Sequence, residues 1–132
     1  DLKRKLKSIQ NDLFDLGADL CVPISENNNG RLRVSTSQIE TLEAEIDEMN
    51  NILKPLNSFI LPGGCKSATF LHLARTICRR AERSVVSLRS KEEINDNTLI
   101  YLNRLSDWLF VASRIENQEN STEVLWAPGK NK

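Results

Sequence analysis

Residues 75–86 read R-T-I-C-R-R-A-E-R-S-V-V, and they place four arginines and one glutamate in a segment with the periodicity of a buried helix. At about 100° per residue, one face of this helix is apolar. That face carries Ala74, Ile77, Cys78, Ala81 and Val85. The neighbouring face carries Arg75, Arg79, Glu82, Arg83 and Val86. Because every cation is an arginine, whose planar guanidinium suits carboxylate and phosphate oxygens, two interpretations stay open: a structural ion-pair helix, or an anion site for phosphate.

Two further helices are predicted before this one. Leucine and isoleucine residues at steps of three and four positions predict a helix over residues 2–20, which Pro23 ends. A capping box of Ser37 with Glu40 predicts the start of the next helix, whose apolar repeat continues to about Leu53. Both helices have one apolar face, so each is expected to pack on a common core.

Capping residues also mark the ends of the arginine-rich helix and of the last helix. Ser67 is predicted to cap the former, which runs to about Leu88 or Arg89. Asn95 or Asp96 is predicted to cap the last helix. The core stripe of that helix consists of Leu102, Leu105, Leu109 and Ala112. Beside it runs a second stripe of Asn103, Asp107, Phe110 and Arg114, which fits either an ion-pair seam or the wall of a site.

The segments between the helices differ in character. Residues 24–36 contain the run Asn-Asn-Asn-Gly and predict a solvated linker. Residues 54–67, K-P-L-N-S-F-I-L-P-G-G-C-K-S, are unusually apolar for a loop. Phe59 and its neighbours therefore either tie two helices together or form a wall of a ligand pocket. Trp126, in the polar tail, is expected to pack back on the body of the protein.

The bulk composition excludes several classes of function. Lysine plus arginine equals aspartate plus glutamate, 18 of each in 132 residues, so the chain lacks the broad positive field of a nucleic-acid binder. No apolar run approaches the roughly 20 residues of a membrane span. We therefore expect neither a nucleic acid nor a membrane as partner. No segment has strand periodicity, and the prediction is an all-α, up-down helical bundle in a single domain, residues 1–132.

The cysteines and the single histidine do not predict a metal centre. Three cysteines, an odd number, indicate free thiols in a reducing compartment. The spacing of Cys65, His72 and Cys78 matches no common zinc pattern. A di-iron helical bundle requires Glu-x-x-His pairs on two helices, which one histidine cannot supply. His72 is predicted to be a surface or interface residue.

Four segments together resemble the PduO-type ATP:cob(I)alamin adenosyltransferases. They are I-Q-N-D-L-F-D-L-G-A-D-L at 9–20, S-F-I-L-P-G-G at 58–64, R-T-I-C-R-R-A-E-R-S-V-V at 75–86, and L-N-R-L-S-D-W-L-F at 102–110. The similarity spans nearly the whole chain, and the pair R-R-A-E-R with L-N-R-L-S-D is highly specific. The resemblance implies a ferritin-like five-helix bundle, of which the first helix is missing here, assembled as a homotrimer with active sites at the subunit interfaces.

The resemblance also implies the reaction and its substrates. The 5′-deoxyadenosyl group of ATP, which is accompanied by Mg²⁺, moves to the cobalt of reduced cobalamin, giving adenosylcobalamin and triphosphate. A recipient mutase or dehydratase that uses adenosylcobalamin is an implied partner. The implied location is the cytoplasm of a prokaryote, or the mitochondrial matrix if the source is eukaryotic. A non-catalytic interaction module with an arginine-rich ion-pair face is the alternative.

The resemblance further implies roles for individual residues. The residues implied to contact ATP are Arg79, Arg80, Glu82, Arg83 and Asn103, with Arg79 also in an ion pair across the subunit interface. Phe59 would lie against the corrin, with Asp107 organising the same wall, and no metal ligand is implied. Arg75 is expected to support packing or the subunit interface. The family's glycine-containing N-terminal segment, which wraps the triphosphate, is absent from these 132 residues, so we expect the chain as given to bind ATP poorly.

Overall fold

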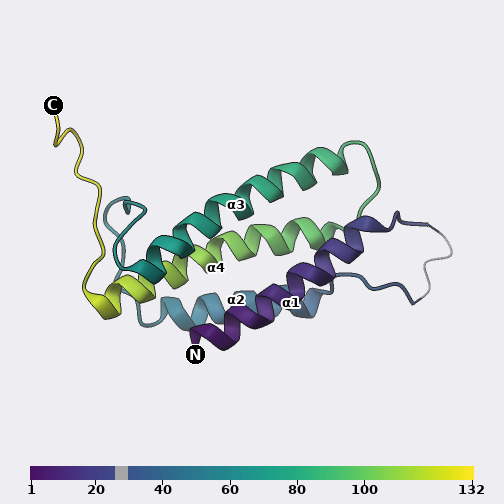
Figure 1. Ribbon diagram of the computed structural model, residues 1–132, viewed down its shortest axis with the longest axis horizontal. Helices are drawn as coiled ribbons and strands as arrows, with labels where there is room; N and C mark the ends of the chain where they lie inside the picture. Colours follow the sequence, from purple (N-terminus) through teal and green to yellow (C-terminus); the bar gives the residue numbers. More distant parts are fainter. Residues whose placement is uncertain (26–29) are drawn as a thin grey trace.

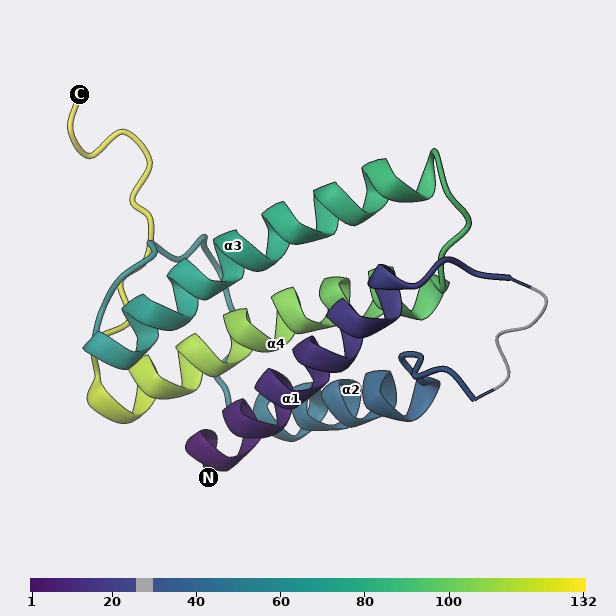
Figure 2. The ribbon, with the colours of Figure 1, turned by 45° about the vertical axis from the view of Figure 1, so that its right-hand side comes forward.

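The computed structural model describes residues 1–25 and 30–132. They form four helices: α1 (Leu2–Cys21), α2 (Thr36–Asn50), α3 (Lys66–Arg89) and α4 (Asp96–Asn120). The views in Figures 1 and 2 show the helices side by side in one bundle, with α3 running alongside α4 and α2 on the other side of α4. The predicted all-α bundle is confirmed. The Asn-Asn-Asn run of the predicted linker lies outside the described residues.

Helix α4 is the centre of the bundle, because α1, α2 and α3 all pack against it. The predicted core stripe of this helix is buried along its whole length. Tyr101 and Trp108 are also fully buried, and each directs its polar atom to a neighbouring helix. The Tyr101 hydroxyl donates to Asp12 of α1 at 2.9 Å, and the Trp108 indole N–H donates to Glu45 of α2 at 2.7 Å. These pairs satisfy the polar ends of large aromatic residues that otherwise stabilise the core by burial.

The predicted start and end of α2 were wrong by a few residues. The capping box is formed by Ser35 with Gln38, two residues before the predicted pair. Gln38 is favoured because its amide also donates to Asp12 and Asp15 of α1. The helix ends at Asn50 rather than near residue 53. Beyond this end, the carbonyl of Ile52 accepts a hydrogen bond from the side chain of Gln118 on α4 at 3.0 Å.

Three predictions for α3 were also wrong. Its N-cap is Cys65, because the Ser67 hydroxyl bonds instead to Glu116 of α4. Ile77 was assigned to the core face but is 49% exposed, so the apolar face of α3 is wider than the surface that the described residues cover. His72 was predicted to be a surface or interface residue, but it is only 5% exposed and so does not lie at the surface of the described chain. The predicted cap of α4 is confirmed, with the Asn95 side chain accepting from the backbone N–H of Asn97.

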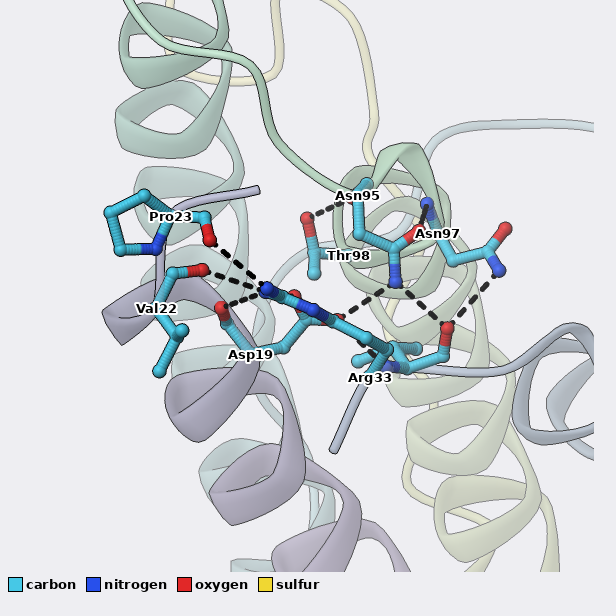
Figure 3. Close-up of polar contacts among 8 residues, drawn as sticks. Asp19, Val22, Pro23, Arg33, Asn95, Asn97 and Thr98 are labelled. Atoms are coloured by element: carbon cyan, nitrogen blue, oxygen red, sulfur yellow. Dashed lines mark hydrogen bonds and ion pairs between the residues drawn. The ribbon is translucent and has the colours of Figure 1, made fainter. Parts of the chain in front are cut away.

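A buried carboxylate, Asp19, holds the end of the bundle where α1 stops and α4 begins (Figure 3). Its two oxygens accept from Arg33 at 2.8 Å, from the Val34 backbone N–H at 2.7 Å and from Asn95 at 2.8 Å. Arg33 also donates to the carbonyls of Asp19 and Val22. One ion pair with several further hydrogen bonds thus joins α1, the segment before α2 and the cap of α4.

Candidate functional site

Helices α3 and α4 pair in an antiparallel register that repeats every two turns. Arg75 faces Phe110, Glu82 faces Asn103, and Arg89 faces Asp96. Each step of seven residues along α3 is thus matched by seven residues back along α4. The second stripe of α4 therefore runs alongside the arginine-rich face of α3, and the candidate site lies along this seam.

A chain of polar contacts crosses the middle of the seam. The Asn103 amide donates to Glu82 at 3.0 Å, and Arg104 donates to the Asn103 side-chain oxygen at 2.6 Å. Arg104 also pairs with Asp107 at 2.9 Å. Glu82 and Asn103 are half-buried, whereas Asp107 is exposed. Both ends of the Asn103 amide are therefore fixed by charged groups, which orients a side chain that can both donate and accept.

The remaining arginines of the face are exposed. Arg79 and Arg83 follow Arg75 at steps of four residues, which places them on one side of α3 about 6 Å apart along the axis. In the described part of the chain, neither Arg79 nor Arg83 makes an ion pair. Arg80 is also exposed, and it lies about 100° from Arg79 and about 60° from Arg83 around the helix, toward the side of Leu73 and Ile77. Around the helix the order is therefore Glu82, Arg79, Arg83 and Arg80, with Glu82 nearest to α4 and Arg80 farthest from it.

An open apolar pocket of about 700 Å³ adjoins the first arginine of the face. It lies between the loop before α3, the side of the α3–α4 pair and the C-terminal tail. Its lining includes Phe59, Arg75, Phe110 and Trp126. The Phe59 side chain is 74% exposed and its ring lies 5.8 Å from that of Trp126. The Arg75 guanidinium lies over the Phe110 ring, 5.1 Å from its centroid, in a cation–π contact.

The pocket wall is fixed by the tail and by one buried asparagine. The Trp126 backbone N–H donates to the Phe59 carbonyl at 2.7 Å, and Leu61 donates to Val124 at 2.9 Å. Asn117, which is 1% exposed, donates to the Gly63 carbonyl at 2.9 Å and accepts from the Cys65 N–H at 3.0 Å. The two interpretations of the apolar loop are therefore compatible: it ties helices together and it also forms one wall of a pocket. Trp126 packs back on the body of the protein, as predicted.

Gly64 permits the close approach of Asn117 to this loop. Its φ is +107°, a backbone conformation that residues with a side chain rarely adopt. A Cβ at this position would lie 2.0 Å from the Asn117 side-chain oxygen. The buried Arg114 adds a second anchor, because it pairs with Glu123 of the tail at 3.0 Å and donates to the Lys54 carbonyl at 2.8 Å. Within the second stripe of α4, Arg114 is therefore structural.

Burial sets the protonation of two side chains beneath the seam. Burial, helped by the charge of the nearby Glu82 and opposed by that of Arg79, raises the pKa of the Cys78 thiol to about 11. The thiol donates to the Leu102 carbonyl at 3.2 Å and stays neutral at physiological pH. Burial, helped by the charge of Arg75, lowers the pKa of His72 below its ordinary value. Neither group has the properties of an activated nucleophile.

The structure adds residues that the sequence did not select as site residues. Arg75, expected to serve packing or the interface, lines the pocket beside Phe59. Phe110 and Trp126 line it too, although the sequence signalled the first only as part of a stripe. Arg104 lies inside the L-N-R-L-S-D segment, but only its contact with Asn103 reveals a role. Within the described residues, no group of three or more His, Cys, Asp and Glu side chains could hold a metal ion.

None of the helices in the described part of the chain combines the length and apolar character that crossing a bilayer requires.

Comparison with known families gives one consistent result. Residues 1–116 match the family model described as "Cobalamin adenosyltransferase". A corrinoid adenosyltransferase from Mycobacterium tuberculosis is 48% identical over 127 residues, which cover 94% of this chain and 65% of that protein. One from Bacillus subtilis is 47% identical over 117 residues, covering 89% of this chain and 59% of that protein. The chain thus spans about two thirds or less of the length of these relatives.

Solved structures give the same result for the fold. A variant PduO-type ATP:corrinoid adenosyltransferase from Lactobacillus reuteri, complexed with cobalamin and ATP, matches with a TM-score of 0.89 and 38% identity, covering 98% of this chain and 70% of that one. A second variant of that protein, complexed with ATP, matches with a TM-score of 0.88 and 38% identity. It covers 96% of this chain and 71% of that chain.

Proposed function

Because the chain belongs to the cobalamin adenosyltransferase family, we propose that it transfers the 5′-deoxyadenosyl group of ATP to the cobalt of reduced cobalamin. One observation carries the proposal: an apolar, aromatic pocket and a row of exposed arginines meet at a single residue, Arg75. The pocket offers a flat apolar surface to a corrin, and the arginines that follow offer donors to a triphosphate.

The chemistry requires little of the protein beyond positioning and charge. Cobalt(I) is the nucleophile: its electron pair forms the bond to C5′, the C5′–O bond breaks, and inorganic triphosphate leaves with the negative charge. The protein must align C5′ with cobalt and stabilise the departing charge, both of which raise the rate without a nucleophilic side chain. This requirement agrees with a seam whose cysteine and histidine are buried and neutral.

We assign the triphosphate to Arg79 and Arg83, with Arg79 as the catalytic cation. Both are exposed and make no ion pair within the described residues, so their donors are available to a phosphate. Glu82 and Asn103 would contact the nucleoside, since their mutual hydrogen bond presents fixed donors and acceptors beside the arginines. Asp107 would organise this wall through Arg104. Mg²⁺ would be held by the phosphates of ATP rather than by a cluster of protein side chains.

We assign the corrin to the pocket of Phe59, with Phe110 and Trp126 as further walls. The exposed Phe59 ring stands on a loop that the tail and Asn117 fix in place. An apolar ring at this point would keep polar ligands away from the lower face of the cobalt, which favours the reduction of cobalt to its nucleophilic state.

We further propose a homotrimer with its active sites between subunits. Two apolar stripes support this, because each is exposed in the described chain: Leu13 and Phe14 on α1, and Phe70, Leu73 and Ile77 on α3. Contiguous exposed apolar surface of this kind marks interfaces. Arg80 lies beside the α3 stripe, so it would reach ATP at the site shared with a neighbouring subunit.

The subunit proposal is tested by measuring mass in solution. Phe14→Glu places a charge on the α1 stripe and is expected to convert the full-length gene product from trimer to monomer in light scattering after gel filtration. Ala44→Glu adds the same charge to an exposed position on α2 and is expected to leave the trimer intact. A trimer in both variants would remove the α1 stripe from the interface.

The proposed setting follows from the reaction. The product suits delivery to a mutase or dehydratase that uses adenosylcobalamin. The bacterial relatives favour a prokaryotic cytoplasm, and a mitochondrial matrix remains the assignment for a eukaryotic source, as a relative from Bos taurus is 43% identical.

The experiment that tests the proposed function follows the corrinoid directly. The full-length gene product is mixed with ATP, Mg²⁺ and chemically reduced cobalamin without oxygen, and the absorbance change to the alkylated corrinoid is recorded. We expect ATP-dependent formation of adenosylcobalamin with release of triphosphate. A folded protein that gives no product would leave the arginine face to a non-catalytic interaction and would refute the proposal.

A further inference from the structure

His72 is a buried histidine with an unused polar atom beside the proposed corrin pocket. It is the only histidine of the chain and is 5% exposed. Within the described residues its Nε2 atom has no hydrogen-bond partner. Buried polar groups are nearly always paired, so an unpaired imidazole nitrogen in the interior calls for an explanation. Neither the core packing nor the proposed adenosyl transfer uses it.

The imidazole contacts the residue that supports the arginine of the pocket. Its ring centroid lies 6.5 Å from that of Phe110, with the rings inclined at 67° in an edge-on arrangement. Phe110 in turn carries the Arg75 guanidinium over its face. His72 precedes Arg75 by three residues on α3, which puts both on the same side of the helix. The Phe110 ring is therefore held between two residues of α3, and two members of this trio line the pocket.

The charged groups around His72 favour its neutral form. On its own helix, Arg75 is the charge that opposes protonation. On the tail, Glu123 favours protonation, but Glu123 already pairs with Arg114 of α4 at 3.0 Å. A proton on His72 would thus add a buried cation next to Arg75, and the one facing carboxylate is engaged elsewhere.

We propose that His72 is a positioning residue of the corrin pocket: its neutral ring fixes Phe110, and through Phe110 the Arg75 side chain, so that acidification loosens the pocket. This inference rests on the proposed function. Because burial lowers the pKa of His72, the folded arrangement favours the neutral ring. A displaced His72 ring has the ordinary histidine pKa of 6.5, so it takes up a proton at a higher pH than the packed ring does. Protonation therefore favours the displaced ring, and the packed arrangement is complete above pH 6.5 and is lost as the pH falls below it.

The test compares the wild-type full-length protein with His72→Phe, which keeps a ring but cannot be protonated. In the adenosylation assay we expect kcat/KM for cobalamin of the wild type to fall about fivefold more than that of His72→Phe between pH 7.5 and pH 5.0. Titration of ATP itself affects both proteins equally and cancels in the ratio. His72→Ala, which removes the ring, is expected to raise KM for cobalamin about tenfold at pH 7.5 while KM for ATP stays within about twofold.

A second measurement does not depend on any variant folding. The imidazole resonance of His72 is assigned through its own backbone, and we expect its titration midpoint in the wild-type protein to lie below 6.5 and to fall further when cobalamin is bound. Wild-type and His72→Phe profiles that run parallel, or a midpoint at or above 6.5, would overturn the inference while product formation at neutral pH upheld the proposed function. Absence of product at every pH would overturn both.

Discussion

Replacing Gly64 with alanine perturbs the pocket loop at one defined contact. The new Cβ would lie 2.0 Å from the side-chain oxygen of Asn117, so the asparagine must move. Asn117 cannot move without giving up its bonds to the Gly63 carbonyl and the Cys65 N–H, and the Thr122 hydroxyl also donates to it at 2.8 Å. The substitution therefore attacks the anchor of the loop rather than the loop surface.

The expected cost is the sum of two effects. A non-glycine residue held at a positive φ such as +107° costs about 1–3 kcal/mol. Displacing the buried Asn117 leaves polar groups without partners, at about 1–3 kcal/mol for each buried group that stays unsatisfied. Together we expect Gly64→Ala to lower the free energy of unfolding by about 4 kcal/mol, which is a large share of the roughly 5–15 kcal/mol of a typical domain.

The assay is denaturant unfolding, with the adjacent glycine as the control. Gly63 has no positive φ, and a Cβ added there would meet no atom within 4 Å, so Gly63→Ala is expected to change the free energy of unfolding by about 0.5 kcal/mol at most. Both variants are compared at one protein concentration. If Gly64→Ala falls within about 1 kcal/mol of Gly63→Ala, the contact with Asn117 does not anchor the loop and the reasoning fails.

Two other predictions concern buried groups. Asp19→Ala removes a buried carboxylate that faces Arg33 and is expected to lower the free energy of unfolding by about 3 kcal/mol. Asp96→Ala removes an exposed ion pair and should lower it by no more than about 1 kcal/mol. Equal losses for the two variants in denaturant unfolding would contradict this prediction. Because burial raises the pKa of Cys78 to about 11, iodoacetamide at pH 8 should modify the exposed Cys21 and spare Cys78. The rate of modification of Cys78 should rise about tenfold for each pH unit up to a pH of about 11. Mass spectrometry of the modified peptides measures both rates.

The fold could be predicted from the sequence because its helices are specified by local periodicity. The repeat from Leu2 onward, the stop at Pro23 and the cap at Asn95 all depend on neighbours within one or two turns, and the structure confirms them. The caps of α2 and α3 could not be predicted the same way. Gln38 and Ser67 are each engaged by side chains of another helix, and such contacts become visible only once the helices are packed.

The candidate site could be predicted only in part, for a related reason. The resemblance of their sequence segments to the family predicts Glu82 and Asn103 as site residues, and the structure brings these two side chains into contact. The pocket around Phe59 depends instead on the return of the tail across the loop, which places Trp126 beside a residue 67 positions away in the sequence. The environment of His72 also depends on distant parts of the chain, because Phe110 of α4 packs edge-on against its ring and the charge of Glu123 in the tail affects its pKa.

The central claim is that the exposed arginine face of α3 binds and activates ATP, and the rate of ATP-dependent adenosylation of reduced cobalamin by Arg79→Ala tests it most directly. The matched control is Arg89→Ala, from the same helix. The Arg89 guanidinium pairs with Asp96 at 2.9 Å, and this ion pair is remote from the pocket. With thermal unfolding recorded for both, we predict that Arg79→Ala loses at least about a hundredfold in kcat/KM without a comparable loss of stability, while Arg89→Ala stays within about twofold of the wild type. Equal rates for the two variants, or an Arg79→Ala protein that loses its fold before its activity, would contradict the account.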